Sequence, residues 1–441
     1  MSTRAPTPPI RWTGSCAALS AIDRAALLDR ASTSDASVRD RTAGIIARVR
    51  AGGDSALRAL AAELDGVTLE SLEVPRDAWL AALDALPAAL RSAMERAAVN
   101  IRRVHEAFLP VAQEIESELG VVVGRRPDAL GRVGVYAPGG RAAYPSSVLM
   151  GVIPARVAGV GEIVVCSPPD RTTGRPSDVV LAAAALAGAD RVFSLGGAGA
   201  IAALAYGTES VARVDRIVGP GNAYVAEAKL LVASAVAIDS PAGPSELLVI
   251  ADESADPQLV AREMLAQAEH DPLAAVVAVM SSEESANAVV RAIGQQLPGH
   301  PRGAIAAAAL QGQSAVLWSE SLEQAVAFSN AYAPEHLLLV LSSPDEVLGK
   351  LRNAGTIFVG AYASVAFGDY MTGANHVLPT GGLARSYSGL STLDFIRWTT
   401  YQRVTRDAAT RLADDVGVFA DAEGLGGHAL AARAWRAEVS S

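Results

Sequence analysis

The sequence predicts an α/β protein with parallel sheets and more than one domain. The chain has 441 residues, more than a single hydrophobic core normally organises. Half of its residues are apolar and 19% are charged, a composition typical of globular proteins. Short runs of valine and isoleucine alternate with alanine-rich helical segments. Strands separated by such helices form βαβ units, which bring the strands together in parallel.

The N-terminal quarter predicts helices. Residues 1–30 indicate a lead-in segment with one short helix. From Ser37 to about Phe108, alanine, leucine and arginine recur at intervals of three and four residues, which is the spacing of one helix face. We expect residues 31–135 to form the first part of a first α/β domain.

Residues 136–245 predict a second α/β domain with a regular alternation of elements. A strand at 134–136 ends in the turn Pro138-Gly139-Gly140. The strands expected next are 163–165 and 191–193, and the expected helices are 147–157, 179–187 and 200–206.

Residues 246–388 repeat this alternation and predict the second part of the first domain. The expected order is strand 246–251, helix 256–270, strand 274–280 and helix 282–297. Residues 389–441 are expected to form a helical tail or a small extra domain.

Charge and cysteine content exclude several classes of protein. The net charge is -10 and no block of lysine and arginine occurs, so neither nucleic acid nor an anionic membrane is an expected partner. Cys16 and Cys166 form no CxxC motif, which disfavours a disulfide scaffold or a cysteine-based zinc site. No apolar stretch predicts a secretory signal or a membrane span, so we expect a cytoplasmic protein.

Two pairs of polar residues suggest metal binding and proton transfer. Gln267 and His270 are three residues apart near a helix end, so both project from one face and could hold a metal ion; a plain surface helix end is the alternative. Glu335 and His336 place a carboxylate beside an imidazole that titrates near neutral pH. A polar loop before a strand is the alternative for this second pair.

Two further clusters carry an acid and a histidine next to glycines. Asp369 and His376 lie in a glycine-bearing segment with little helical or strand pattern, where a loop could approach a ligand. An ordinary turn explains this segment equally well. Glu423 and His428 flank a glycine-rich run in the tail, for which a helix-start loop is the alternative.

Two glycine-bearing runs in residues 136–245 suggest dinucleotide binding. Residues 197–202 follow a strand, open a helix and fit GxGxxA, so a phosphate could lie at that helix N-terminus. The second run is Gly219-Pro220-Gly221-Asn222. An alanine- and glycine-rich chain also produces such matches by chance, and Asp215 is a poor candidate for a ribose-binding acid.

Taken in order, these segments resemble the histidinol dehydrogenase family over nearly the whole chain. The matching segments are 134–140, 207–210, 219–222, 241–246, 267–270, 334–337, 368–370 and 375–380, followed by Glu423 and His428. The resemblance implies two incomplete Rossmann-like domains with parallel sheets, a short N-terminal segment and a helical C-terminal tail. The first domain would be interrupted by the second.

The resemblance also implies an activity and its machinery. The activity is the two-step, NAD-dependent oxidation of L-histidinol through L-histidinaldehyde to L-histidine, with one Zn²⁺ per subunit. A related zinc dehydrogenase of another small amino alcohol or sulfonated diol is the alternative. Glu335 and His336 would be the acid/base pair. The implied zinc ligands, which also contact substrate, are Gln267, His270, Asp369 and His428.

The remaining implied contacts are to substrate, cofactor and a second subunit. Ser245, His376 and Glu423 match substrate-side positions, and His336 also contacts substrate. Tyr136 and Asn222 match NAD-binding positions, as does Gly199, where the family usually has a glutamine. The resemblance further implies a homodimer in which the tail crosses to the partner's site, so Glu423 and His428 would serve the active site of the other subunit.

Overall fold

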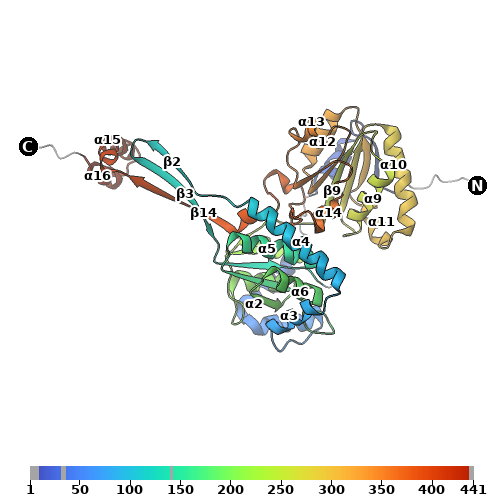
Figure 1. Cartoon of the computed structure of the whole chain (residues 1–441), viewed down its shortest axis with the longest axis horizontal. Coiled ribbons are helices and arrows are strands. Elements are labelled where there is room, and N and C mark those ends of the chain that lie inside the picture. Colours follow the sequence, from blue (N-terminus) through green and yellow to red (C-terminus); the bar gives the residue numbers. More distant parts are fainter. Residues whose placement is uncertain (1–8, 31–35, 140–142, 437–441) are drawn as a thin grey trace, which may run out of the picture. The chain divides into compact units, whose positions relative to one another are not determined.

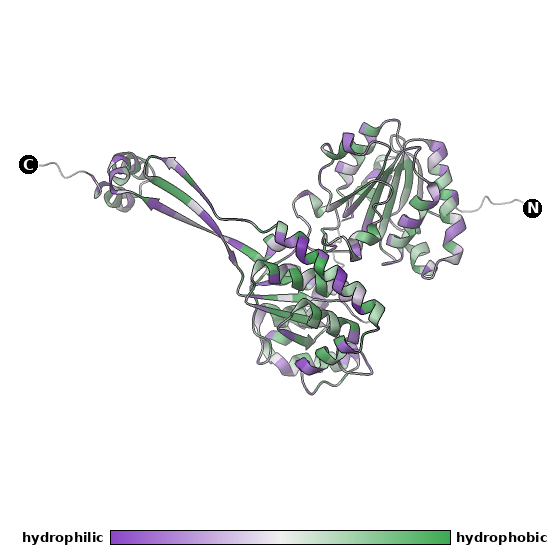
Figure 2. Cartoon of the chain, viewed as in Figure 1, coloured by the Kyte–Doolittle hydropathy of each residue, from purple (hydrophilic) through white to green (hydrophobic). Residues whose placement is uncertain are grey.

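The computed structural model describes residues 9–30, 36–139 and 143–436, and the chain divides into two compact units (Figure 1). Unit 1 comprises Met1–Phe108 and Leu130–Phe395, and unit 2 comprises Leu109–Ala129 and Ile396–Ser441. Unit 1 contains two parallel sheets, as the sequence predicts. Figure 2 shows hydrophobic residues concentrated in the strands of both sheets.

The first sheet of unit 1 has six parallel strands in the order β1-β11-β10-β9-β12-β13. Its strands are β1 (Trp12–Ser15), β9 (Glu246–Ala251), β10 (Ala275–Met280), β11 (Ala315–Trp318), β12 (His336–Val340) and β13 (Thr356–Val359). Every residue of β9, β10 and β12 is buried, as in parallel strands covered on both faces.

Helices cover both faces of this six-stranded sheet. On one face, Leu247 and Val249 share a core with α9 (Pro257–Ala268), α10 (Glu283–Gln296) and α11 (Gly303–Gln311). On the other face, Leu248 and Ile250 pack with α1 (Ala21–Leu28), α12 (Leu322–Tyr332) and α13 (Asp345–Leu348). Alternate residues of β9 therefore point to opposite layers.

The second sheet of unit 1 has five parallel strands in the order β6-β5-β4-β7-β8. Its strands are β4 (Arg132–Tyr136), β5 (Glu162–Ser167), β6 (Arg191–Ser194), β7 (Arg216–Val218) and β8 (Ala237–Ile238). One core contains α3 (Arg76–Asp84), α4 (Ala88–Ala107), α5 (Pro145–Ala158) and α6 (Asp178–Ala187). The opposite core contains α2 (Ala36–Leu60), α7 (Gly197–Tyr206) and α8 (Ala223–Val232).

The helices of the N-terminal quarter belong to the cores of the five-stranded sheet. The sequence-based domain prediction groups residues 31–135 with residues 246–388, whereas α2, α3 and α4 pack against helices that flank β4, β5 and β6. The periodicity that identifies these helices does not reveal which sheet they cover. The boundaries of independently folding domains stay a prediction.

The motif at residues 207–210 has a structural role beside a kink in α2. Gly53 has φ 50°, and the helix resumes at Asp54. The Asp54 carboxylate accepts a hydrogen bond from Thr208 Oγ1 at 2.6 Å, and the Asp54 N–H donates to Glu209 Oε2 at 2.8 Å. The second bond gives a partner to one of the backbone N–H groups that lack a partner within the helix at the start of the second half of α2.

Unit 2 is a three-stranded antiparallel sheet with two helices. The strand order is β14-β3-β2, formed by Gln113–Glu118 (β2), Val121–Ala129 (β3) and Ile396–Val404 (β14). The helices α15 (Arg406–Ala422) and α16 (Gly426–Arg433) confirm the predicted helical C-terminal end. The long strand β14 was not predicted, because its residues are mostly exposed and give little apolar alternation.

Both cysteines are buried and free. Within the described part of the chain, none of the helices is long and apolar enough to cross a bilayer.

Candidate active site

The predicted acid/base pair lies at the amino end of β12, next to the first residue of β9. Glu335 and His336 are 6% and 3% exposed. His336 Nδ1 lies 2.9 Å from the carbonyl oxygen of Glu246, which can only accept a hydrogen bond, so Nδ1 carries a proton. In the neutral imidazole the lone pair is therefore on Nε2, which lies 3.7 Å from Asp369 Oδ1.

The charges around this pair are strongly coupled. Burial raises the pKa of the Glu335 carboxyl. Desolvation lowers the pKa of His336, but the carboxylates of Glu335 and Asp369 outweigh it and raise this pKa to about 10. Because these two carboxylates cause the rise, neutralising them would lower the His336 pKa toward its ordinary value. The imidazole can then accept a proton near neutral pH.

The predicted metal-binding helix, α9, is confirmed as a helix that ends just before His270. Asp256 caps its N-terminus by accepting from the Gln258 N–H at 2.9 Å, and Pro257 occupies its first turn. Gln267 is 2% exposed, and its Nε2 has no hydrogen-bond partner among the described residues. His270 is exposed, and its Nδ1 lies 3.4 Å from Ser245 Oγ.

Asp369 lies on a short helix, α14 (Val365–Tyr370), which the sequence did not predict, whereas residues 371–380, which include His376, have no helix or strand as expected. Gly368 permits close packing against the ring of Phe358, where a Cβ would not fit. The same ring lies 6.0 Å from that of His336, centroid to centroid. A glycine in a six-residue helix gives no periodic pattern, which explains the missed element.

Asp369 sits among three imidazoles. Desolvation raises its pKa, but His336, His376 and His270 reverse this effect and leave the pKa below its usual value. His376 Nδ1 donates to the backbone carbonyl of Asp369 at 2.8 Å. The structure therefore gathers a set of predicted residues at the amino ends of strands in the six-stranded sheet: Ser245, His270, Glu335, His336, Asp369 and His376.

The last two predicted site residues lie in unit 2. Glu423 is the C-terminal cap residue of α15 and His428 lies in α16, and both are exposed. Across the described residues of one chain, no three His, Cys, Asp or Glu side chains form a group that could hold a metal ion. The donors Gln267, His270 and Asp369 suit zinc chemically, with the amide oxygen as the ligand atom of Gln267.

A cavity of about 820 Å³ lies at the carboxyl ends of the strands in the five-stranded sheet. All three residues predicted to contact a dinucleotide line it: Tyr136, Gly199 and Asn222. The Tyr136 hydroxyl accepts from the Gly197 N–H at 3.1 Å, at the start of α7. Asn222 Oδ1 accepts from the N–H groups of Tyr224 and Val225 at 3.1 and 3.2 Å and so caps α8. The carboxyl ends of parallel strands are the usual position for nucleotides.

Sequence reasoning missed the charged residues of this cavity. Arg41 comes from α2, Asp65 ends the short π-helix η1 (Ala61–Asp65) that follows α2, and Arg171 lies in a connecting segment. Burial raises the pKa of Asp65, and Arg171 opposes that shift. No motif links these positions, because they meet only in the folded chain. A Cβ on Gly199 would lie 3.5 Å from Leu60 Cδ1, an ordinary contact, so this position has room for a side chain.

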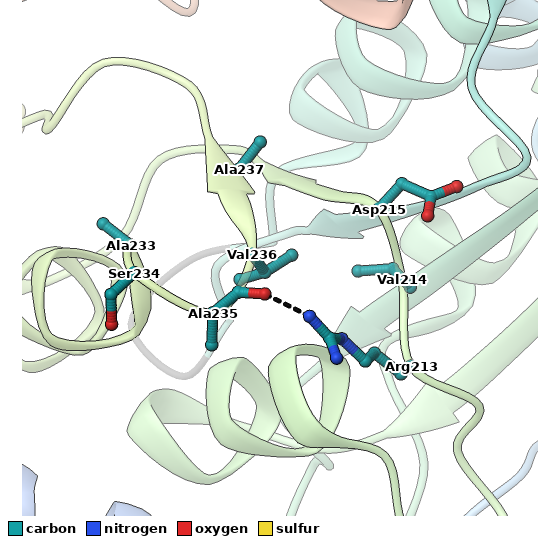
Figure 3. A pocket seen from close by; sticks show the side chains of 8 residues that line it. All are labelled: Arg213, Val214, Asp215, Ala233, Ser234, Ala235, Val236 and Ala237. Carbon is teal, nitrogen blue, oxygen red and sulfur yellow. Dashed lines mark hydrogen bonds between the residues drawn. The ribbon is translucent and has the colours of Figure 1, made fainter. Parts of the chain in front are cut away.

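A second cavity, of about 590 Å³, lies at the amino ends of β7 and β8 (Figure 3). Its arginine, Arg213, donates to the carbonyl of Ala235. Its acid, Asp215, accepts from the Arg132 N–H at 2.9 Å. Both charged groups are thus occupied by the backbone, and the cavity contains none of the predicted site residues.

Comparisons with known proteins agree with one another. Residues 28–436 match the family described as histidinol dehydrogenase. The chain is 48% identical over 390 residues to a histidinol dehydrogenase of Methanosarcina barkeri, covering 88% of this chain and 90% of that protein. It is 50% identical over 407 residues to one of Halobacterium salinarum, covering 92% and 95%.

A solved structure is also closely similar. The crystal structure of histidinol dehydrogenase from Elizabethkingia anophelis superposes with a TM-score of 0.93 at 34% identity, covering 97% of this chain and 98% of that one. The relatives described here share one name. They therefore do not favour the alternative of a dehydrogenase for another amino alcohol or a sulfonated diol.

Proposed function

This chain belongs to the histidinol dehydrogenase family, and from that premise we propose that it oxidises L-histidinol through L-histidinaldehyde to L-histidine with NAD. The observation that carries the proposal is the buried Glu335–His336 pair beside Asp369 and His270. We further propose that the enzyme works in the cytoplasm as part of histidine biosynthesis.

His336 would act first, as the general base. Its Nδ1–H is held by the Glu246 carbonyl, which leaves Nε2 to accept the proton of the substrate hydroxyl. As this proton leaves, the carbon that bears the hydroxyl gives up a hydride and becomes the aldehyde carbon. NAD, when bound, accepts that hydride.

Glu335 would act in the second step, when the aldehyde becomes a carboxylate. A water adds to the aldehyde, and a base must take its proton. Burial raises the pKa of Glu335, which makes its carboxylate a better base near neutral pH than an exposed one. The hydrate then loses a second hydride, so each histidinol reduces two NAD.

Gln267, His270 and Asp369 would hold one Zn²⁺ together with His428 of the partner subunit. An amide, a carboxylate and two imidazoles suit zinc, which would orient the imidazole and amine of histidinol. Ser245, His376 and Glu423 of the partner subunit would contact substrate from the surrounding positions. The exposure of His270 supports this assignment.

NAD would occupy the cavity lined by Tyr136, Gly199 and Asn222. The start of α7 faces this cavity, so the helix N-terminus suits a phosphate, although the Gly197 N–H already donates to Tyr136. Because Asn222 Oδ1 already caps α8, its side-chain NH₂ is the group left to donate to the cofactor. Family members usually have a glutamine at the position of Gly199, so this site would lack the amide contact that a glutamine provides.

A substrate comparison tests the proposed activity. The purified enzyme, loaded with zinc, is expected to reduce NAD with L-histidinol and to give no rate above background with 2,3-dihydroxypropanesulfonate. An imidazole and an amine can bind a cation beside Asp369, whereas a sulfonate brings negative charge to that carboxylate. If the enzyme reduced NAD with the sulfonated diol but not with L-histidinol, the proposed substrate would be rejected.

We propose that the active enzyme is a homodimer in which each unit 2 completes the site of the other subunit. Large exposed hydrophobic side chains in unit 2 support a buried interface there. They include Ile115, Leu119, Val418, Phe419 and Leu430, which are between 65% and 76% exposed.

Mixing two inactive variants tests the exchange of the tail. His336→Asn and His428→Asn are each expected to be inactive alone. When equal amounts of the two variants are unfolded and refolded together, half of the dimers should contain one chain of each variant. Each such dimer has one intact site of two, so about a quarter of wild-type activity should return. If each tail served its own subunit, no mixture would regain activity.

A further inference from the structure

We infer that Arg30 and Glu246 form a buried positioning pair that holds the acid/base residues in their working geometry. Neither residue touches the reacting atoms in the proposed mechanism. The inference rests on the proposed function for its kinetic test, and a second test is independent of activity.

Glu246 contacts both members of the acid/base pair. Its backbone N–H donates to Glu335 Oε2 at 2.7 Å, and its backbone carbonyl accepts from His336 Nδ1 at 2.9 Å. The Glu246 side chain is 3% exposed and also accepts, at Oε2, from the Glu335 N–H at 3.4 Å. The position of Glu246 thus determines where the Glu335 carboxylate lies and which tautomer His336 adopts.

The Glu246 carboxylate also fixes a neighbouring turn. Its Oε1 accepts from the N–H of Gly381 at 2.7 Å, and Thr380 Oγ1 accepts from the N–H of Gly243 at 2.5 Å. The turn at 380–381 is therefore tied to the segment that carries Ser245 and Glu246. One carboxylate connects this turn with the start of β12.

Arg30 holds the Glu246 carboxylate with a two-point contact. Arg30 Nε lies 2.9 Å from Glu246 Oε1, and Nη2 lies 3.1 Å from Oε2. Its other N–H groups donate to the carbonyls of Leu27, Leu28 and Tyr332, so all five donors of the guanidinium are used. A lysine in this position could not reproduce the two-point contact.

Arg30 also supports the turn that leads into the acid/base pair. It lies 3.4 Å from the centre of the Tyr332 ring and donates to the Tyr332 carbonyl at 2.8 Å. The next residue, Ala333, has φ 54°, a left-handed conformation that alanine rarely adopts, and it precedes Pro334. Such a conformation persists only where surrounding contacts enforce it, and Arg30 provides one of them.

Stability alone does not account for this pair. Burying two opposite charges costs desolvation that their attraction roughly repays, so apolar replacements are often equally stable. The Arg30–Glu246 contact joins residues 216 positions apart, and the backbone of Glu246 bonds both proposed catalytic side chains. The pair therefore serves mainly to position the catalytic residues. Breaking it should lower kcat by more than a loss of folding stability explains.

The kinetic test uses Arg30→Met, Arg30→Lys and the double variant Arg30→Met/Glu246→Gln in the zinc-loaded dimer. Arg191→Met is the matched control, because Arg191 makes a similar two-point contact with Glu73 at 2.9 and 2.6 Å away from the acid/base pair. Arg30→Met should lower kcat about 10- to 100-fold with little change in the KM for histidinol. Arg30→Lys should recover part of this loss.

The double variant separates positioning from charge balance. It removes the unpaired buried charge, so Tm should recover toward that of the wild type while kcat stays low. The control should keep its kcat. If kcat followed Tm across all variants, or if Arg30→Met matched the wild type, the inference would be wrong. An inactive wild type would count against the proposed function instead.

The activity-independent test observes the His336 ring directly. In wild-type protein with isotopically labelled histidine, NMR should detect a hydrogen-bonded Nδ1–H of His336 that exchanges slowly with solvent. The signal is assigned by its loss in His336→Asn. It should broaden or exchange faster in Arg30→Met and stay unchanged in Arg191→Met. An unaltered signal in Arg30→Met, or a proton on Nε2 alone in the wild type, would overturn the inference.

Discussion

Replacing His336 with asparagine is expected to lower kcat for histidinol oxidation by about 10²- to 10⁴-fold, the usual contribution of a general base. Asparagine has no group that accepts a proton near neutral pH, whereas Nε2 of His336 is a titratable nitrogen that lies 3.7 Å from Asp369 Oδ1. Bound zinc should be retained, because His336 is not among the proposed ligands. Steady-state kinetics and metal analysis of the same preparation measure both quantities.

Glu335→Gln is the companion variant for this prediction. If the two residues divide the two steps, Glu335→Gln should still oxidise the alcohol but convert the aldehyde slowly, so that aldehyde accumulates. His336→Asn should be slow from the first hydride transfer onward. Wild-type turnover in His336→Asn would remove the base assignment, and equal retention of both steps in Glu335→Gln would remove the second role.

Replacing Asp369 with asparagine is expected to lower zinc affinity by at least about 10-fold and to reduce activity at limiting zinc in proportion. The substitution removes the only carboxylate of the proposed ligand set. It also removes a negative charge that lies 3.7 Å from His336 Nε2. Zinc titration followed by activity and by direct metal analysis measures the change, and added zinc should restore part of the activity.

A matched carboxylate distinguishes a ligand from a general charge effect. Asp178 is 66% exposed and pairs with Arg175 at the start of α6. Asp178→Asn changes the net charge by the same amount and should bind zinc like the wild type. Asp369→Asn with unaltered zinc affinity would show that Asp369 is not a ligand.

The repeating elements of unit 1 could be predicted because their patterns are strong. The expected strands at 163–165, 246–251 and 274–280 all fall within observed strands or overlap them by several residues. Buried parallel strands appear as continuous apolar runs, and the helices between them are long enough to show their period. These signals are local, so one sequence contains them.

The elements that were missed depend on contacts between distant segments. Strand β14 pairs with β3 across more than 250 residues and is largely exposed, so it lacks an apolar pattern. The short helix α14 depends on Gly368 packing against Phe358. Which sheet the early helices cover is likewise a property of the folded chain.

The candidate site could be predicted only in part. Gln267–His270 and Glu335–His336 are visible because each pair is close in sequence, and the ordered resemblance to a family added the rest. Arg30, whose guanidinium reaches Glu246, follows the short helix α1 and precedes no motif. Residues that position others carry no local signature, because their partners are chosen by the fold.

The measurement that tests the central claim most directly is the stoichiometry of a single reaction driven to completion. A known, limiting amount of L-histidinol is mixed with zinc-loaded enzyme and excess NAD, and both NADH and L-histidine are quantified. The account predicts two NADH and one L-histidine per histidinol, with the aldehyde consumed. One NADH per histidinol with stable aldehyde, or no NADH, would contradict a site in which Glu335 and His336 serve successive oxidations.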